Sequence, residues 1–389
     1  MSAIAGKPTT GTDEPCRILD LRDSPWVDGP GRTIVDTAAT IDPLRYNIAV
    51  GAFVAGDPGE HRYLEEARRR GLATCAIAER RALDIGVLRQ IERWCRDHRV
   101  QLVHTHDFRS DLYGLVAARR LGIPAVATCH GWIANNFKGR MYVRADKRLL
   151  RRFDRVIVVS ERMRDQLRAA GVDEARIAVV PNALVVADYR PRRGDTAVRS
   201  EWGVPAHAKL VVNIGRLSPE KGQALFLRAA AELARERPDA HFALVGIGPD
   251  EALLRRLAGE LGIAERVVFA GYRSDMQAVY DSVDLVVQSS STEGMPNVIL
   301  EALLMRVPVV ATDVGGTAEI VEHGHSGILV RSGDLAGLVR AMREALADPE
   351  RAQARADHGE RRVRAEFDHA TRLRRIERVY DDVAGLRRA

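Results

Sequence analysis

The stretch LVVQSSSTEGMPNVILEALL, residues 285–304, predicts the local fold that repeats along this chain. Its first residues are apolar and β-branched, which favours a buried strand, and its last residues form an apolar run typical of a helix. Pro296 precedes that run and suits the first turn of a helix, where no backbone hydrogen bond is lost. Two carboxylates, Glu293 and Glu301, lie in the loop and inside the helix. Backbone N–H groups at a helix start suit an anionic phosphate, and a carboxylate suits the vicinal hydroxyls of a polyol.

The same alternation of strand and helix runs through the sequence. The predicted strands are residues 17–21, 46–54, 74–78, 102–106, 125–130, 156–160, 177–181, 210–215, 241–246, 267–271, 285–288, 309–312 and 327–330. Amphipathic Ala-, Arg- and Leu-rich segments separate them, which favours parallel sheets covered by helices on both faces. Because 389 residues exceed one ordinary core, we predict an α/β protein of two doubly wound, Rossmann-like domains that face each other across a cleft.

The domain boundaries follow from composition. We predict a disordered tail at residues 1–15, a first domain at residues 16–190 and a second at residues 191–369. The helical segment 370–389 is expected to pack back on the first domain. Residues 1–15 lack the apolar core of a signal peptide, and no segment is apolar over the length of a bilayer, so a cytoplasmic location is expected.

Composition argues against several classes of function. Aromatic residues make up only 5% of the chain, which does not favour base stacking, and we expect no nucleic-acid partner. The four cysteines, Cys16, Cys75, Cys95 and Cys129, are far apart and lack metal-binding spacing. They are interpreted as buried thiols rather than as a disulfide framework or a zinc site.

A second motif, NIGRLSPEKG at residues 213–222, follows a predicted strand and precedes a helix predicted at residues 223–235. It carries two cations, Arg216 and Lys221. Cations at the carboxyl end of a strand point toward the edge where open α/β sheets bind ligands. Arg clamps a phosphate with two hydrogen bonds, whereas Lys acts as a point charge. Taken alone, Lys221 is better explained as the start of a surface helix.

Together, the two motifs resemble the retaining glycosyltransferases of family 4. The resemblance extends to Pro308–Thr312 (PVVAT) and to Gly315-Gly316; it is detailed from about residue 209 to 330 and looser elsewhere. It implies the GT-B architecture of two Rossmann-like domains and a nucleotide-sugar donor. It also implies that the protein needs no cofactor and no divalent metal, and the sequence has no Asp-x-Asp pair that would hold one.

The resemblance assigns roles to individual residues. Arg216 and Lys221 would hold the diphosphate of the donor and stabilise its leaving charge, and Glu293 would bind hydroxyls of the donor sugar. Glu301 would accept hydrogen bonds from the ribose. The remaining donor-binding residues would lie in the loop beside Glu293, at the helix start that faces the β-phosphate and in the loop at the nucleobase. They are Gly294, Met295, Pro296, Asn297, Val298, Ile299, Tyr272 and Arg273.

The first half supplies weaker candidates. Asp28–Arg32 (DGPGR) resembles the glycine turn of the family near the donor phosphates, with Gly31 at the close approach and a helix expected from Thr33. A plain strand–helix turn explains it nearly as well. His130 ends a predicted strand before a glycine, and the family often has a histidine there, close to the reacting carbons. Asp107 is a candidate acceptor contact. For His104 and His106, core packing and support of neighbouring residues are equally plausible.

Two segments depart from the plain pattern. Met305-Arg306 stands where the family usually has a small residue and a glycine, so Arg306 is expected to use a geometry other than the left-handed one. Residues 138–155 hold eight basic and two acidic residues around one apolar face. Such a helix lies on an anionic membrane surface, or it is a core-packed helix with a solvated outer face, and the two explanations are about equally good.

The sequence therefore predicts a retaining hexosyltransferase whose catalytic residues are His130, Arg216, Lys221 and Glu293. The donor would be a UDP- or GDP-sugar and the acceptor a glycan or a lipid-linked glycan in the synthesis of cell-surface polysaccharide, such as exopolysaccharide, or of glycolipid. The protein would be cytoplasmic or peripheral at the inner membrane face. The alternatives are a nucleotide-sugar epimerase or a phosphorylase on the same fold, and a non-catalytic scaffold of a glycan-assembly complex.

Overall fold

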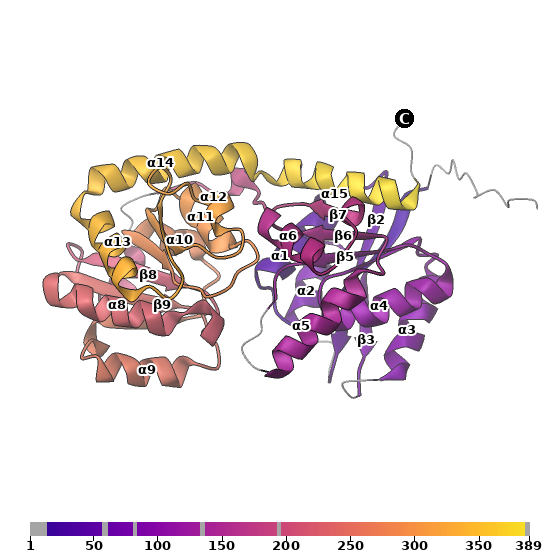
Figure 1. Cartoon of the computed structure of the whole chain (residues 1–389), viewed down its shortest axis with the longest axis horizontal. Helices are drawn as coiled ribbons and strands as arrows, with labels where there is room; N and C mark the ends of the chain where they lie inside the picture. Colours follow the sequence, from indigo (N-terminus) through magenta and orange to yellow (C-terminus); the bar gives the residue numbers. More distant parts are fainter. Residues whose placement is uncertain (1–13, 57–60, 81–83, 133–136, 193–195, 386–389) are drawn as a thin grey trace, which may run out of the picture. The chain divides into compact units, whose positions relative to one another are not determined.

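The computed structural model describes residues 14–56, 61–80, 84–132, 137–192 and 196–385. The chain forms two compact units (Figure 1). The first comprises Met1–Thr128, Arg152–Arg155 and Glu377–Ala389, and the second comprises Cys129–Arg151 and Val156–Ile376. Most of the tail predicted at residues 1–15, and the last four residues of the segment predicted at 370–389, lie outside the described residues.

The first sheet has seven strands in the order β3-β2-β1-β4-β5-β6-β7. The strands are β1 (Cys16–Arg22), β2 (Tyr46–Val54), β3 (Thr74–Ala78), β4 (Leu102–Thr105), β5 (Ala125–Cys129), β6 (Arg155–Val158) and β7 (Ile177–Val179). Strand β1 pairs in parallel with both β2 and β4, so the order of strands reverses beside β1. The helices between them are α1 (Gly29–Thr40), α2 (Arg62–Arg69), α3 (Ile85–Asp97), α4 (Phe108–Leu121), α5 (Phe137–Leu150) and α6 (Glu161–Ala169).

The second sheet has six strands in the order β10-β9-β8-β11-β12-β13. They are β8 (Lys209–Ile214), β9 (Ala240–Val245), β10 (Val267–Gly271), β11 (Leu285–Gln288), β12 (Val309–Thr312) and β13 (Ile328–Val330). The order reverses between β8 and β11, which pair in parallel. The helices are α7 (Ala197–Glu201), α8 (Gln223–Glu236), α9 (Glu251–Glu260), α10 (Met276–Ser282), α11 (Asn297–Leu304), α12 (Thr317–Ile320), α13 (Leu335–Ala347), α14 (Pro349–Glu366) and α15 (His369–Ala384).

The predicted doubly wound α/β architecture is confirmed. Every predicted strand is present, with bounds within two residues, because a strand buried on both faces reads as a continuous apolar run. The core of the second sheet shows this packing: Phe226 of α8 and Phe242 of β9 are fully buried and meet edge to face, with ring centroids 6.2 Å apart. Ala229 and Ala230 of α8 are also fully buried in this core.

Three local predictions were wrong. Helix α1 begins at Gly29 rather than Thr33, because Asp28 caps it and accepts a hydrogen bond from the backbone N–H of Gly31 at 3.0 Å. Pro296 is the N-cap of α11 and has an extended backbone, so it precedes the first turn instead of opening it. Arg306 does adopt the left-handed conformation, with φ of 56°, although it is not a glycine. Its guanidinium pairs with Asp357 at 2.8 Å.

Candidate functional site

The two sequence motifs meet at one edge of the second sheet. The first motif follows β8 and the second follows β11, and these strands are neighbours in the sheet. Because the carboxyl ends of parallel strands lie at the same edge, the loops after them are adjacent. Lys221, at the end of a short 3₁₀ helix (Pro219–Lys221), contacts Glu293: its Nζ lies 2.7 Å from Glu293 Oε1.

Glu293 is a fixed, largely buried carboxylate. Its side chain is 9% exposed, against 29% for that of Lys221. The hydroxyl of Ser290 donates to the same Oε1 oxygen at 2.7 Å. Two donors therefore hold one oxygen of the carboxylate, and this arrangement orients the group at the edge of the sheet.

Backbone contacts join the two loops. The N–H of Ser291 donates to the carbonyl of Glu220 at 2.8 Å, and the hydroxyl of Ser289 donates to the carbonyl of Gly222 at 2.8 Å. Gly222 has φ of 66°, and a Cβ there would lie 2.1 Å from the carbonyl oxygen of Ser289. Only glycine allows this approach, so Gly222 fixes the position of Lys221 relative to the loop that carries Glu293.

Arg216 also has a carboxylate partner. Its Nη2 lies 2.5 Å from Glu220 Oε1, and the hydroxyl of Ser218 donates to that oxygen at 2.6 Å. Glu220 is buried, whereas the side chain of Arg216 is 58% exposed. The guanidinium thus keeps an open face toward solvent while its position is tied to the buried carboxylate.

Three glycine turns pack backbone to backbone beside Glu293. A Cβ on Gly294 would lie 1.9 Å from the carbonyl oxygen of His130, and a Cβ on Gly315 would lie 2.0 Å from that of Glu293. Gly131 has φ of 130° and faces the backbone of Gly294. The backbone carbonyl of the half-buried His130 therefore lies next to the loop of Glu293.

Glu301 lies in α11 and is buried rather than solvated. Its two carboxylate oxygens accept hydrogen bonds from tyrosine hydroxyls, Tyr189 at 3.2 Å and Tyr280 at 2.9 Å. Sequence reasoning missed both tyrosines, because a single tyrosine far from the motif carries no local signal. They orient the carboxylate that was predicted to bind ribose hydroxyls.

The other predicted donor-binding residues differ in their surroundings. At the start of α11, the carbonyl of Met295 accepts from Asn182 at 2.8 Å, and the N–H of Ile299 donates to the carbonyl of Pro296 at 3.2 Å. Asn297 and Val298 are half-buried. These contacts fix the helix start that was predicted to face the β-phosphate.

The loop predicted at the nucleobase has one exposed residue and one residue that forms ion pairs. Tyr272 is exposed. Arg273 pairs with Asp275 and with Glu201, and the hydrogen bond to Asp275 followed by that to Glu201 raises the pKa of the guanidinium. Arg273 therefore shapes this loop, whereas Tyr272 offers a free aromatic face.

In the first unit, two predicted residues have clear local roles. Gly31 lies in the first turn of α1, where a Cβ would lie 2.2 Å from the guanidinium of Arg22. Asp107 caps α4 through the N–H of Ser110 at 3.1 Å and accepts from the N–H of Asp23 at 2.6 Å. Burial raises the pKa of Asp107 to about 6, against the effect of these hydrogen bonds.

Asp20, His104 and His106 form the one group with metal-binding spacing among the described residues. Both ring nitrogens of His104 already have side-chain partners, Tyr380 at 2.8 Å and Thr128 at 2.7 Å. His106 Nε2 lies 2.9 Å from Asp20. We interpret the group as a buried polar network that joins β1 and β4 to α15, because a metal would have to displace these hydrogen bonds.

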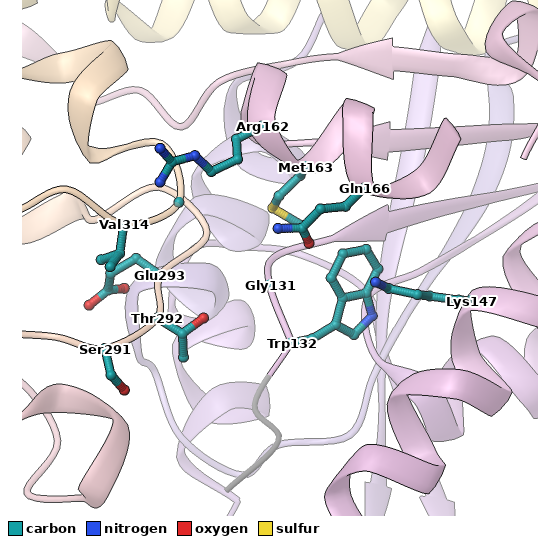
Figure 2. Close-up of a pocket in the computed structure, with 11 residues that line it drawn as sticks. Gly131, Trp132, Lys147, Arg162, Met163, Gln166, Ser291, Thr292, Glu293 and Val314 are labelled. Atoms are coloured by element: carbon teal, nitrogen blue, oxygen red, sulfur yellow. The ribbon is translucent and has the colours of Figure 1, made fainter. Parts of the chain in front are cut away.

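A pocket of about 270 Å³ lies beside Glu293 within the second unit. Figure 2 shows Ser291, Thr292 and Glu293 on one side and Trp132 with Lys147 on the other, while Arg162 of α6 also lines the pocket. The sequence singled out the basic segment that contains Lys147 only as a membrane or surface helix, and no motif assigned Trp132, Lys147 or Arg162 to this site.

Two doubly wound sheets, with paired cations and acids at the edge of the second, are typical of a GT-B glycosyltransferase. The sequence matches the family model "Glycosyltransferase Family 4" over residues 27–188 and the model "Glycosyl transferases group 1" over residues 195–362. A D-inositol 3-phosphate glycosyltransferase of Thermobispora bispora is 30% identical over 321 residues, which cover 76% of this chain and 74% of that protein. The chain belongs to glycosyltransferase family 4, as its sequence motifs predicted.

Other relatives support the same family. The alpha-D-kanosaminyltransferase of Streptomyces kanamyceticus is 30% identical, over 66% of this chain and 70% of the relative. A D-inositol 3-phosphate glycosyltransferase of Nocardia farcinica is 34% identical over 68% of this chain, but the chain spans only 62% of its length. The structure of HepE from Anabaena, solved in complex with UDP-glucose, has the same fold: the TM-score is 0.84 at 23% identity, over 95% of this chain and all of that one.

No helix of the described residues combines the length and the apolar character that crossing a membrane requires.

Proposed function

We propose that this glycosyltransferase moves a hexose from a UDP- or GDP-sugar to a glycan or lipid-linked acceptor, with retention at the anomeric carbon. The observation that carries the proposal is the contact of Lys221 with Glu293 at the carboxyl ends of β8 and β11. It brings a cation for a diphosphate and a carboxylate for sugar hydroxyls to one point, beside the start of α11.

In the proposed reaction, the bond between the anomeric carbon and the diphosphate oxygen breaks while an acceptor hydroxyl attacks from the same face. The acceptor proton passes to the departing phosphate, and no covalent nucleophile is invoked. Arg216 and Lys221 stabilise the negative charge that develops on the leaving diphosphate. Fixed charges of this kind are among the largest contributions to catalysis because they need no reorganisation. His130 lies beside the reacting carbons.

Glu301 and its tyrosines bind the ribose that stays behind. A carboxylate that is held by Tyr189 and Tyr280 has lone pairs left for the two ribose hydroxyls. The complexes of Anabaena HepE with UDP and UDP-glucose favour a uridine nucleotide as the first donor to test.

A thermal-shift panel tests the donor. The wild type is mixed with UDP, GDP, ADP and dTDP and with their glucose conjugates, and the same panel is repeated on Lys221→Met. We expect one base to stabilise the wild type and the shift to be lost in the variant. Lys209→Met is the matched control, because Lys209 lies at the amino end of β8 and pairs with Asp284 there. If no nucleotide stabilises the wild type, the proposal is wrong.

Product analysis then separates the reaction classes. A transferase requires a second sugar or lipid and is inhibited by free UDP or GDP, whereas an epimerase converts the donor alone and a phosphorylase requires inorganic phosphate. NMR of the product anomer tests retention. A non-catalytic scaffold would keep its function in a complementation assay after Arg216→Ala or Lys221→Ala.

We further propose that α5 docks the protein on an anionic membrane, at the inner membrane face in the cell. Phe137 and Met141 are exposed large apolar residues one helical turn apart, and Tyr142 is exposed beside them. Arg140, Arg144 and Arg148 are exposed on the same helix. Apolar insertion combined with basic residues is the composition that binds anionic lipid surfaces. This location would suit a lipid-linked acceptor and the assembly of cell-surface polysaccharide or glycolipid.

Sedimentation with vesicles tests the membrane contact. We expect binding to phosphatidylglycerol vesicles, weaker binding in high salt and none to phosphatidylcholine vesicles. Phe137→Ser/Met141→Ser should abolish it, whereas Leu253→Ser, at an exposed apolar residue of α9, serves as the control. Equal sedimentation of the wild type and the α5 variant would contradict the proposal.

A further inference from the structure

The pocket of Figure 2 holds a cation, Lys147, that has no carboxylate partner among the described residues. Two of its charged groups are balanced: Glu293 pairs with Lys221 at 2.7 Å, and Arg162 pairs with Asp313 at 3.2 Å. Lys147 forms no ion pair with any residue that the structure describes. Its Nζ lies 4.3 Å from the centroid of the Trp132 ring instead.

Trp132 is held in place beside this cation. Its indole N–H donates to Asp146 at 2.8 Å, and Asp146 is buried. Asp146 directly precedes Lys147 in the sequence, but its carboxylate is used by the indole. The pocket therefore presents a fixed aromatic ring and, next to it, a half-buried ammonium that no described carboxylate compensates.

We propose that this pocket binds the acceptor and that Lys147 selects acceptors with an anionic group, a carboxylate or a phosphate, on a sugar or polyol ring that lies against Trp132. The inference rests on the proposed function, because Glu293 lines the pocket and is the residue proposed to hold the donor sugar. An acceptor in the pocket would thus be adjacent to the sugar that it receives.

Electrostatics favour an anion over a neutral ring at this position. An ammonium beside an indole loses part of its hydration, and charge–charge attraction grows as the surroundings become less polar. A hydrogen bond between a cation and an anion is also stronger than one between neutral groups. A neutral hydroxyl at the same point would only accept a hydrogen bond from Lys147 and would leave the charge uncompensated.

Binding of three small probes tests the inference. D-glucose, D-glucuronate and glucose 6-phosphate share a ring and differ in charge, and the last two separate a carboxylate from a phosphate. The fluorescence of Trp132 reports binding, with Trp132→Phe as the blank for the other three tryptophans. We expect at least one charged probe to bind the wild type about tenfold more tightly than glucose does, as suits a charge-assisted contact on a half-buried group.

Lys147→Met should reduce the affinity for the charged probe to that for glucose. Lys209→Met is the matched control and should keep the preference, because Lys209 does not line this pocket. The inference is overturned if the wild type binds no charged probe more tightly than glucose, or if Lys147→Met keeps the preference. A circular dichroism spectrum confirms that each variant is folded.

The same samples are titrated with UDP and GDP to separate the two proposals. If a nucleotide stabilises the protein but the probes are not distinguished, only the inference about the acceptor fails. If no nucleotide binds but the charged probe is preferred, the anion pocket stands and the proposed donor fails.

Discussion

Replacing Gly222 by alanine tests the claim that this glycine positions Lys221. Gly262 provides a matched control, because both glycines have nearly the same backbone conformation, with φ of 66° and 70°. A Cβ on Gly262 would meet nothing within 4 Å, whereas a Cβ on Gly222 would lie 2.1 Å from the carbonyl oxygen of Ser289. The pair of variants therefore separates the cost of the left-handed backbone from the cost of the contact.

The magnitudes follow from these two terms. A left-handed alanine costs about 1–2 kcal/mol of folding free energy, and both variants incur it. In Gly222→Ala, the contact must also open from 2.1 Å to at least 3.0 Å, which displaces the Ser289 carbonyl. Overpacking of this kind costs roughly 1–3 kcal/mol more. For a domain of this size, about 1 kcal/mol changes the melting temperature by roughly 2–4 °C, so Gly222→Ala should melt about 2–12 °C below Gly262→Ala.

Differential scanning calorimetry measures the melting temperatures, and release of UDP or GDP measures activity. Displacement of the loop separates Lys221 from Glu293, so Gly222→Ala should also lose activity, whereas Gly262→Ala should keep it. If the two variants have the same melting temperature and the same activity, the close packing of the two loops does not determine the position of Lys221.

Four further outcomes are expected. Lys221→Met should lower kcat by roughly 100- to 1,000-fold, measured by release of the nucleotide, because a donor to the transition state is lost. Tyr280→Phe removes the 2.9 Å hydrogen bond to Glu301 and should raise the Kd for the donor nucleotide by about tenfold, measured by calorimetric titration. Burial raises the pKa of Asp107 from 3.8 to about 6, so the folded state binds its proton more tightly than the unfolded state does. The free energy of unfolding of the wild type, relative to that of Asp107→Asn, should therefore fall as pH rises from about 4 through about 6, as followed by urea titrations. Glu293→Gln should abolish the preference for UDP-sugar over UDP without weakening the binding of UDP itself, and paired titrations with the two ligands would detect this.

The strands and the meeting of the two motifs could be predicted from the sequence because their signals are local. Buried parallel strands are continuous apolar runs, and adjacent strands bring their loops together whatever the packing elsewhere. The starts of helices were harder to predict. Asp28 is a good N-cap residue, but the glycines and the proline after it resemble a turn. Arg306 was expected to avoid the left-handed conformation that a glycine adopts easily, yet it adopts that conformation and its guanidinium pairs with Asp357.

The partners of the site residues could not be predicted. Tyr189 lies 112 residues from Glu301 and Asn182 lies 113 from Met295, so no spacing rule connects them. Glu220 is an exception to this rule, because it stands only four positions after Arg216. Residues at that spacing in a turn lie within reach of each other. Trp132 has no motif around it, and the basic segment around Lys147 indicated a membrane or surface helix, so only the fold brings both residues beside Glu293.

In the proposed function, the pairing of each cation with a carboxylate would let the site bind both the diphosphate and the sugar of a donor. Lys221 balances Glu293, and Arg216 balances Glu220, so neither cation is an isolated buried charge. In the proposed function, a diphosphate would compete with Glu293 for Lys221, and the released carboxylate would accept hydrogen bonds from the sugar. Glu220 is deeply buried and has Ser218 as a second donor, so in the proposed function it would keep its place while the exposed Arg216 turned to the diphosphate. Removing the charge of Glu293 should therefore weaken binding of the sugar but not of the nucleotide, because the Lys221 ammonium then pairs with the phosphates alone.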